Sequence, residues 1–309
     1  MGASLLTLVG PAIGETIATL PPLFSRQDTN PLTESGLRYE EVAFPTDDGL
    51  TLRGWFIPAD YRLEGGTAQA GAPAVVYVPG TGRDLRSGLS LVAPFHQAGY
   101  HVLLFSYRGS GRSDGNWLGF SYGDAESRDV DAAVRFLSET KGVGRVGAIG
   151  YSAGAVSVIL SAARNPQIEA VVAVAPYNCV DEVWQTGRPA MMPAFLQDLT
   201  LWLTEKRKGF DRDRICPVDV VDQIAPRPLL VIHGTEDRRI LETQVRRLFA
   251  AASEPKSLWL VAGATHNSIR TPVLDELAPR VVSFMDGALG QAVHQAQAEP
   301  PAQHRPQAM

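Results

Sequence analysis

The chain has 309 residues, of which 45% are hydrophobic and 20% are charged, a balance typical of a globular protein with a large core. Its formal net charge is -5 with both signs interspersed, so the sequence predicts no basic surface for binding nucleic acid. Cys179 and Cys216 lie far apart and in no metal-ligand spacing, and we expect both to be free thiols.

Residues 1–38 are predicted to form an N-terminal extension. Their apolar start lacks the basic residues of a secretory signal and is interrupted by Pro11, Gly14 and Glu15. It is also too short and too broken to span a bilayer. We therefore expect a cytoplasmic protein, with export or membrane association through this segment as the alternatives.

The next segment alternates apolar and polar residues on both sides of Asp48-Gly49, which predicts an antiparallel hairpin. Further along, short apolar runs rich in Val, Ile and Leu predict strands that are buried on both faces. These runs cover residues 74–78, 100–106, 145–149, 168–174, 228–232 and 257–261. Stretches with helical spacing separate them, so the sequence predicts an α/β fold with a mostly parallel sheet and helices on both faces.

Residues 177–225 interrupt this alternation with a long apolar segment, and we interpret them as a helical cap inserted over the strand ends. Residues 287–309 are rich in Ala, Gln and Pro without an apolar face and are predicted to be disordered. The main domain is therefore expected to span residues 39–286.

Ser152 lies between Gly150 and Gly154, at a turn from a predicted strand into a predicted helix. The pattern Gly-x-Ser-x-Gly in this context indicates a nucleophile elbow, in which the serine has a strained backbone and the small neighbours avoid collisions. A hydroxyl thrust forward at a helix N-terminus suits nucleophilic attack, because the helix dipole favours developing negative charge.

A serine nucleophile needs a general base and a carboxylate that orients the base. Asp237 follows the strand at 228–232, and His266 follows the strand at 257–261, in the chain order expected for an elbow serine. Glu236 is the rival carboxylate. The sequence thus predicts catalytic Ser152, Asp237 and His266.

The oxyanion hole should use two backbone N–H groups, one from the residue after the nucleophile and one from the loop after an early strand. The first is Ala153. For the second we choose Thr81, which lies between Gly80 and Gly82. The proposed chemistry requires no metal or organic cofactor, and we expect none. Residues 142–147 match the dinucleotide-binding pattern G-x-G-x-x-G, but they precede a strand and so cannot bind a pyrophosphate at a helix N-terminus.

Four ordered motifs carry a resemblance to a known superfamily: GYSAG at 150–154, FSYRGSGRSDG at 105–115, PLLVIHGTEDRRI at 228–240 and GATHNS at 263–268. Together they resemble the α/β-hydrolase superfamily over about residues 39–286. Within this superfamily, these motifs and the inserted segment most resemble those of lidded esterases, thioesterases, depalmitoylase-like hydrolases and serine aminopeptidases. In the loop after the strand at 74–78, members of the superfamily often have His-Gly where this chain has Pro79-Gly80.

This resemblance implies a serine hydrolase that cleaves a small-molecule carboxylic ester or thioester through an acyl-enzyme. A serine aminopeptidase or amidase is the main alternative, and it would need free carboxylates, such as Asp181 or Glu182, to hold an amino terminus. A non-catalytic ligand-binding protein is a further alternative. The apolar residues of the cap predict an acyl pocket. Its candidates are Trp184, Met191, Met192 and Phe195.

Overall fold

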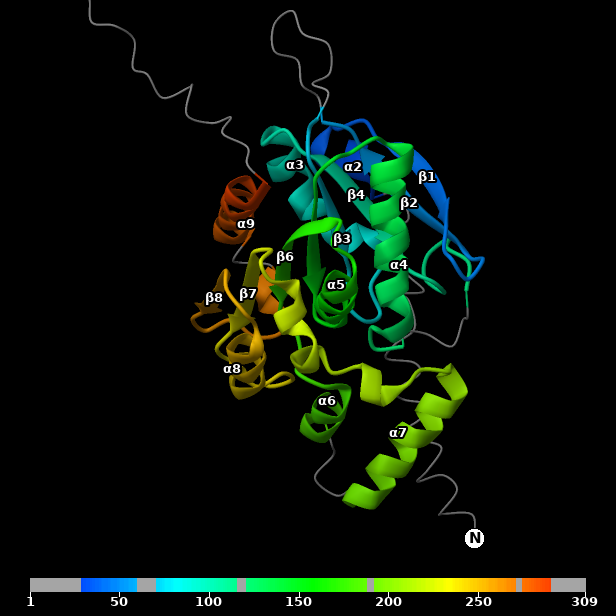
Figure 1. The fold of residues 1–309 in the computed structure, drawn as a ribbon, viewed down its shortest axis with the longest axis vertical. Coiled ribbons are helices and arrows are strands. Elements are labelled where there is room, and N and C mark those ends of the chain that lie inside the picture. The colour runs from blue at the N-terminus through cyan, green and yellow to red at the C-terminus, as the bar shows by residue number, and fades with distance from the viewer. Residues whose placement is uncertain (1–28, 60–70, 116–120, 188–191, 271–273, 290–309) are drawn as a thin grey trace, which may run out of the picture.

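The computed structural model describes residues 29–59, 71–115, 121–187, 192–270 and 274–289 (Figure 1). Most of the predicted N-terminal extension, most of the predicted tail, and Met191 lie outside these ranges. Within the described residues, no helix has the length and apolarity needed to cross a membrane.

In the described ranges, eight strands form one sheet in the order β1-β2-β4-β3-β5-β6-β7-β8. The strands are β1 (Glu40–Pro45), β2 (Thr51–Ile57), β3 (Ala74–Val78), β4 (His101–Ser106), β5 (Val146–Tyr151), β6 (Ile168–Val174), β7 (Leu229–Gly234) and β8 (Lys256–Val261). β2 pairs antiparallel with β1 and with β4, and the remaining neighbours are parallel. The predicted hairpin and the mostly parallel sheet are both confirmed.

Helices cover both faces of this sheet, because successive strand residues point to opposite sides. In β3, Val76 belongs to the core beneath α4, α5 and α8, whereas Val75 packs in the core beneath α3 and α9. The α-helices among the residues that the structure describes are α2 (Pro31–Ser35), α3 (Leu89–Gln97), α4 (Asp124–Arg135), α5 (Ala153–Arg164), α6 (Val180–Thr186), α7 (Ala194–Lys208), α8 (Glu242–Ala251) and α9 (Leu274–Leu289). The fold is the predicted α/β-hydrolase architecture.

A helical insertion, which contains α6 and α7, separates β6 from β7 (Figure 1). Short 3-10 turns at Arg212–Arg214, Pro217–Asp219 and Val221–Ile224 lead from α7 back to the sheet. The chain therefore leaves the sheet at the carboxyl end of β6, beside the end of β5 that precedes Ser152.

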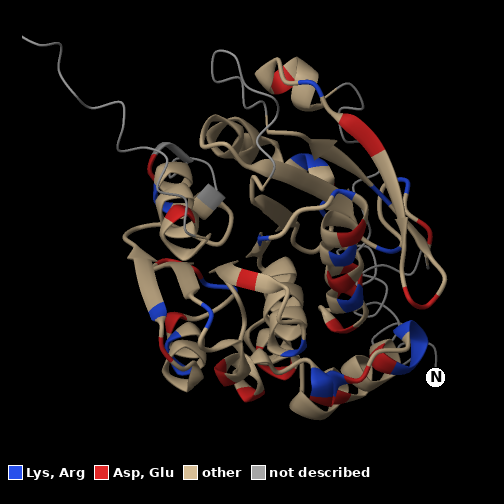
Figure 2. Cartoon of the chain, turned by 45° about the horizontal axis from the view of Figure 1, so that its top comes forward, with Lys and Arg blue, Asp and Glu red and all other residues tan. Residues whose placement is uncertain are grey.

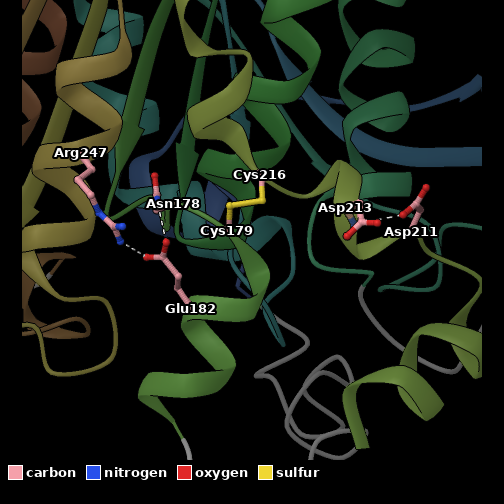
Figure 3. The surroundings of a disulfide bond; sticks show 7 residues. All are labelled: Asn178, Cys179, Glu182, Asp211, Asp213, Cys216 and Arg247. Atoms are coloured by element: carbon pink, nitrogen blue, oxygen red, sulfur yellow. Dashed lines mark hydrogen bonds and ion pairs between the residues drawn. A yellow bond between two sulfur atoms is a disulfide. The ribbon is translucent and has the colours of Figure 1, made fainter. Parts of the chain in front are cut away.

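The prediction of two free thiols is wrong, because Cys179 and Cys216 form a disulfide at the base of this insertion (Figure 3). Cys179 directly precedes α6, and the Val180 N–H donates a 3.0 Å hydrogen bond to the Ile215 carbonyl beside it. The separation of 37 residues hides this proximity, since the insertion leaves and rejoins the sheet at neighbouring points.

Candidate active site

Ser152 occupies a strained turn between β5 and α5. Its φ of 54° and ψ of -121° lie in a region that residues other than glycine rarely adopt. A conformation of this kind costs on the order of 1–3 kcal/mol and persists only when its surroundings impose it. The Ser152 N–H is held by a 2.8 Å hydrogen bond to the Val174 carbonyl of β6, and α5 begins at the next residue.

Both flanking glycines are required by close backbone contacts. A Cβ at Gly150 would lie 2.5 Å from the Cα of Ala155, and a Cβ at Gly154 would lie 2.3 Å from the carbonyl oxygens of Val78 and Pro79. These distances are far below van der Waals contact, and the neighbours are main-chain atoms that cannot rotate away. Because Gly150 and Gly154 lack a Cβ, α5, β5 and the loop after β3 can all pack closely around the turn at Ser152.

The structure brings Ser152, His266 and Asp237 into one hydrogen-bonded line at the strand ends. His266 Nε2 lies 3.1 Å from Ser152 Oγ, and His266 Nδ1 lies 2.6 Å from Asp237 Oδ2. Because a carboxylate can only accept, Nδ1–H donates to Asp237, which leaves Nε2 free to accept the serine proton. All three side chains are buried.

The surroundings of Asp237 favour its ionised form. Burial raises the pKa of this carboxyl, but the hydrogen bond from His266 and the backbone N–H groups of Ile240 and Arg239 outweigh burial, so the pKa is lowered. The rival Glu236 is exposed to solvent. Asp237 is therefore the carboxylate that reaches the imidazole.

Two tyrosines that the sequence analysis did not single out hydrogen-bond to loops around the site. The buried Tyr107 hydroxyl donates to the carbonyls of Pro79 and Gly80, the latter at 3.1 Å, and burial keeps its pKa well above the ordinary value. The Tyr151 hydroxyl donates to the His266 carbonyl, and the two rings lie 5.4 Å apart. Their positions beside known motifs were the only signal, because sequence does not reveal where a hydroxyl points.

The two expected oxyanion donors lie in suitable elements. Ala153 is the first residue of α5, and an N–H at that position has no acceptor within its own helix. Thr81 follows Gly80 in a tight turn, in which the Arg83 N–H donates to the Gly80 carbonyl at 3.2 Å. The use of Thr81 as a donor stays a prediction.

The acyl-pocket candidates lie in different environments. Trp184 is half-buried in α6 and packs edge-on against Tyr122 at 6.2 Å, and Met192 is half-buried just before α7. Phe195, by contrast, is 67% exposed on α7. Met191 lies outside the described residues. Phe195 and Trp184 thus differ in their exposure to solvent, and an acyl pocket made by these residues stays a prediction.

The carboxylate of Glu182 is already paired. It accepts a hydrogen bond from Asn178 at 2.7 Å and forms an ion pair with Arg247 (Figure 3). A carboxylate that is neutralised in this way is a poor binding group for a free amino terminus. Among the described residues, no group of three or more His, Cys, Asp or Glu side chains could hold a metal ion.

Comparison with known proteins places these features in a family. The model of the prolyl oligopeptidase family matches residues 87–291. The uncharacterized protein Rv2307c of Mycobacterium tuberculosis is 31% identical over 233 residues, which cover 74% of this chain and 72% of that protein. The polyketide transferase ATR5 of Stachybotrys chlorohalonatus is 36% identical over 294 residues, covering 80% of this chain and 96% of that protein. Among solved structures, the Pyrococcus furiosus esterase Pf2001 has a TM-score of 0.70 at 23% identity and covers 88% of this chain and 100% of its own.

Proposed function

Because the chain belongs to the prolyl oligopeptidase family of α/β-hydrolase-fold serine hydrolases, we propose that it cleaves carboxylic esters or thioesters through an acyl-enzyme intermediate. The observation that carries this proposal is the hydrogen-bonded line from Ser152 Oγ through His266 to Asp237. A receptor that had lost catalysis would have no need to keep all three groups in contact.

In the proposed mechanism, Ser152 Oγ attacks the acyl carbon while His266 Nε2 removes its proton. The resulting imidazolium is stabilised by Asp237, whose lowered pKa keeps it ionised. The oxyanion accepts hydrogen bonds from the Ala153 and Thr81 amides. His266 then returns the proton to the leaving alcohol or thiol, and water attacks the acyl-enzyme to release the acid.

The pairing of Glu182 argues against one way of holding an aminopeptidase substrate. The family includes peptidases by name, and an aminopeptidase needs acidic groups free to bind an ammonium. Glu182 is held by Asn178 and Arg247, whereas Oδ1 of the neighbouring Asp181 is buried without a hydrogen-bond partner. Asp181 is therefore the one of these two acids with an oxygen left to meet an ammonium, and Asp181→Asn tests the aminopeptidase alternative. Esters and thioesters carry no ammonium, so their turnover should be unchanged in that variant.

Acyl transfer to an alcohol or amine is a second candidate. It is supported by the 36% identity to a polyketide transferase along nearly all of that protein's length. The chemistry differs only in the final step, where the acceptor rather than water attacks the acyl-enzyme. Exclusion of water from the site would favour this outcome.

The disulfide bears on the location of the protein. Bonds between cysteines persist mainly in oxidising compartments, so Cys179–Cys216 supports an exported protein over the cytoplasmic location expected from the N-terminal sequence. Fractionation of cells that express the full chain tests this choice.

Labelling with a fluorophosphonate, followed by turnover of nitrophenyl esters of increasing acyl length and of matched nitroanilides, tests the function. We expect labelling and ester turnover, with anilides cleaved far more slowly. Adding a primary alcohol separates the two candidates, because a transferase forms the new ester in preference to the free acid. Faster cleavage of anilides than of esters would refute the proposed substrate class.

A further inference from the structure

The α7 helix exposes its apolar side to solvent. Four large hydrophobic side chains, at positions spaced for one side of a helix, are exposed: Phe195 by 67%, Leu199 by 37%, Trp202 by 47% and Leu203 by 40%. We call these four residues the outer face of α7. In the described part of the chain, the other exposed large hydrophobics are the isolated Leu32 and Leu241.

The opposite side of α7 packs on the protein with mainly polar residues. Gln197, Thr200 and Thr204 are buried there together with Leu201. Their polar groups are satisfied internally, since the two threonine hydroxyls donate to helix carbonyls at 2.7 and 2.8 Å and Gln197 donates to the Trp184 carbonyl. The helix is therefore inverted relative to an ordinary surface helix, and its apolar side is available to a partner.

Basic residues extend the outer face toward the carboxyl end of α7. The last turn contains Lys206, Arg207 and Lys208, and Figure 2 colours the Lys and Arg residues of the described chain blue. The spacing of four residues places Lys206 on the same side of the helix as Trp202. Lys206 and Arg207 are exposed, whereas Lys208 lies over the Tyr122 ring. The acids of α7, Asp198 and Glu205, are fewer than these bases.

Trp, Phe and Leu on one side of a helix, with basic residues beside them, fit the boundary between lipid acyl chains and anionic headgroups. We propose that the outer face of α7 docks the protein on an anionic lipid surface. The aromatic and leucine side chains enter the acyl boundary, and Lys206 and Arg207 reach the headgroups.

A second copy of the chain fits this face less well. Antiparallel pairing of two α7 helices would bring the basic last turn of each against the N-terminus of the other, where the helix dipole is also positive. An anionic lipid surface complements the same basic residues.

Docking through α7 would also hold the active site near the lipid. The insertion leaves the sheet at the carboxyl end of β6, and the neighbouring strand β5 leads directly into Ser152. The docking proposal does not rest on the proposed function, because it concerns residues outside the line of Ser152, His266 and Asp237.

Flotation of the full chain with vesicles tests the proposal. Vesicles of phosphatidylcholine alone are compared with vesicles that also contain phosphatidylglycerol, and we expect binding at least about tenfold stronger to the anionic set, weakened by salt. The double variant Phe195→Ser, Trp202→Ser should bind about tenfold more weakly or worse. Leu241→Ser, which alters a side chain that is 44% exposed just before α8, should bind like the wild type.

Two further measurements keep the result unambiguous. The variants should melt at no lower temperature than the wild type, because the substituted side chains are exposed and Leu241→Ser places a favoured capping residue before α8. Ser152→Ala should bind vesicles normally although it is inactive. Absent wild-type binding, or equal binding by the Phe195 and Trp202 double variant, would overturn the proposal. Light scattering that detects a wild-type dimer, which the same double variant dissociates, would assign the face to a second copy instead.

Discussion

Ser152 combines a strained backbone with a hydroxyl that contacts a general base. Ser152→Ala removes only the Oγ atom, so we expect turnover to fall by about six orders of magnitude while the fold remains. Fluorophosphonate labelling, ester turnover and circular dichroism measure these effects. Persistent labelling of the variant would show that another serine is the nucleophile.

The acid of the site offers a matched pair of variants. Asp237→Asn keeps the shape of the side chain but favours the wrong imidazole tautomer, so kcat should fall by about 10⁴-fold. Glu236→Gln changes an exposed neighbour and should leave kcat nearly unchanged. Steady-state kinetics on one ester compares them, and a larger loss from Glu236→Gln would identify Glu236 as the orienting carboxylate.

Sequence reasoning selected Ser152, Asp237 and His266 because chain order and strand ends restrict where such groups can lie. The roles of the Tyr107 and Tyr151 hydroxyls were not predicted, because their acceptors are carbonyls of loops that are remote in sequence. The donor role of Thr81 was assigned from its neighbouring glycines alone. Residue type and spacing thus predict which elements meet, but not the orientation of single polar atoms.

The junction of β5, α5 and the loop after β3 depends on Gly154. Gly154→Ala would force a Cβ within 2.3 Å of two carbonyl oxygens, so we expect a loss of about 3 kcal/mol or more in unfolding free energy. Activity should fall further than stability explains, because the loop with Thr81 must move. Urea unfolding and ester turnover measure both.

Gly144 provides the control for this substitution. A Cβ there would meet open space, and its φ lies outside the left-handed region, so Gly144→Ala should change the unfolding free energy by less than about 0.5 kcal/mol. If Gly154→Ala proves equally mild, the packing argument for the elbow fails.

The insertion shows how far apolar patterns can predict an element. Its apolar residues correctly indicated helices between β6 and β7, because a long apolar segment must fold. They did not reveal that α7 turns Gln197, Thr200 and Thr204 inward and Phe195 outward. Polar side chains that donate to nearby main-chain carbonyls can be buried, and hydrophobic periodicity does not reveal this possibility.

At the scale of the whole molecule, the disulfide should contribute to stability. Bonding Cys179 to Cys216 restricts a loop of 37 residues in the unfolded chain, which corresponds to about 4 kcal/mol in the chain-entropy model. The double variant Cys179→Ser, Cys216→Ser should unfold at correspondingly lower urea concentration. Reductant should destabilise the wild type and leave this variant unaffected, and two thiols that titrate in the unfolded wild type before reduction would contradict the bond.

The same disulfide also determines where the backbone can be cut without separating the chain into two pieces. Residues 179–216 form a covalent ring that contains α6 and α7. A single protease cut inside this ring leaves two fragments that remain joined through sulfur, so Ser152 on the first stays tied to Asp237 and His266 on the second. New chain ends, or a spliced foreign peptide, could therefore be introduced within the insertion without separating the halves of the active site.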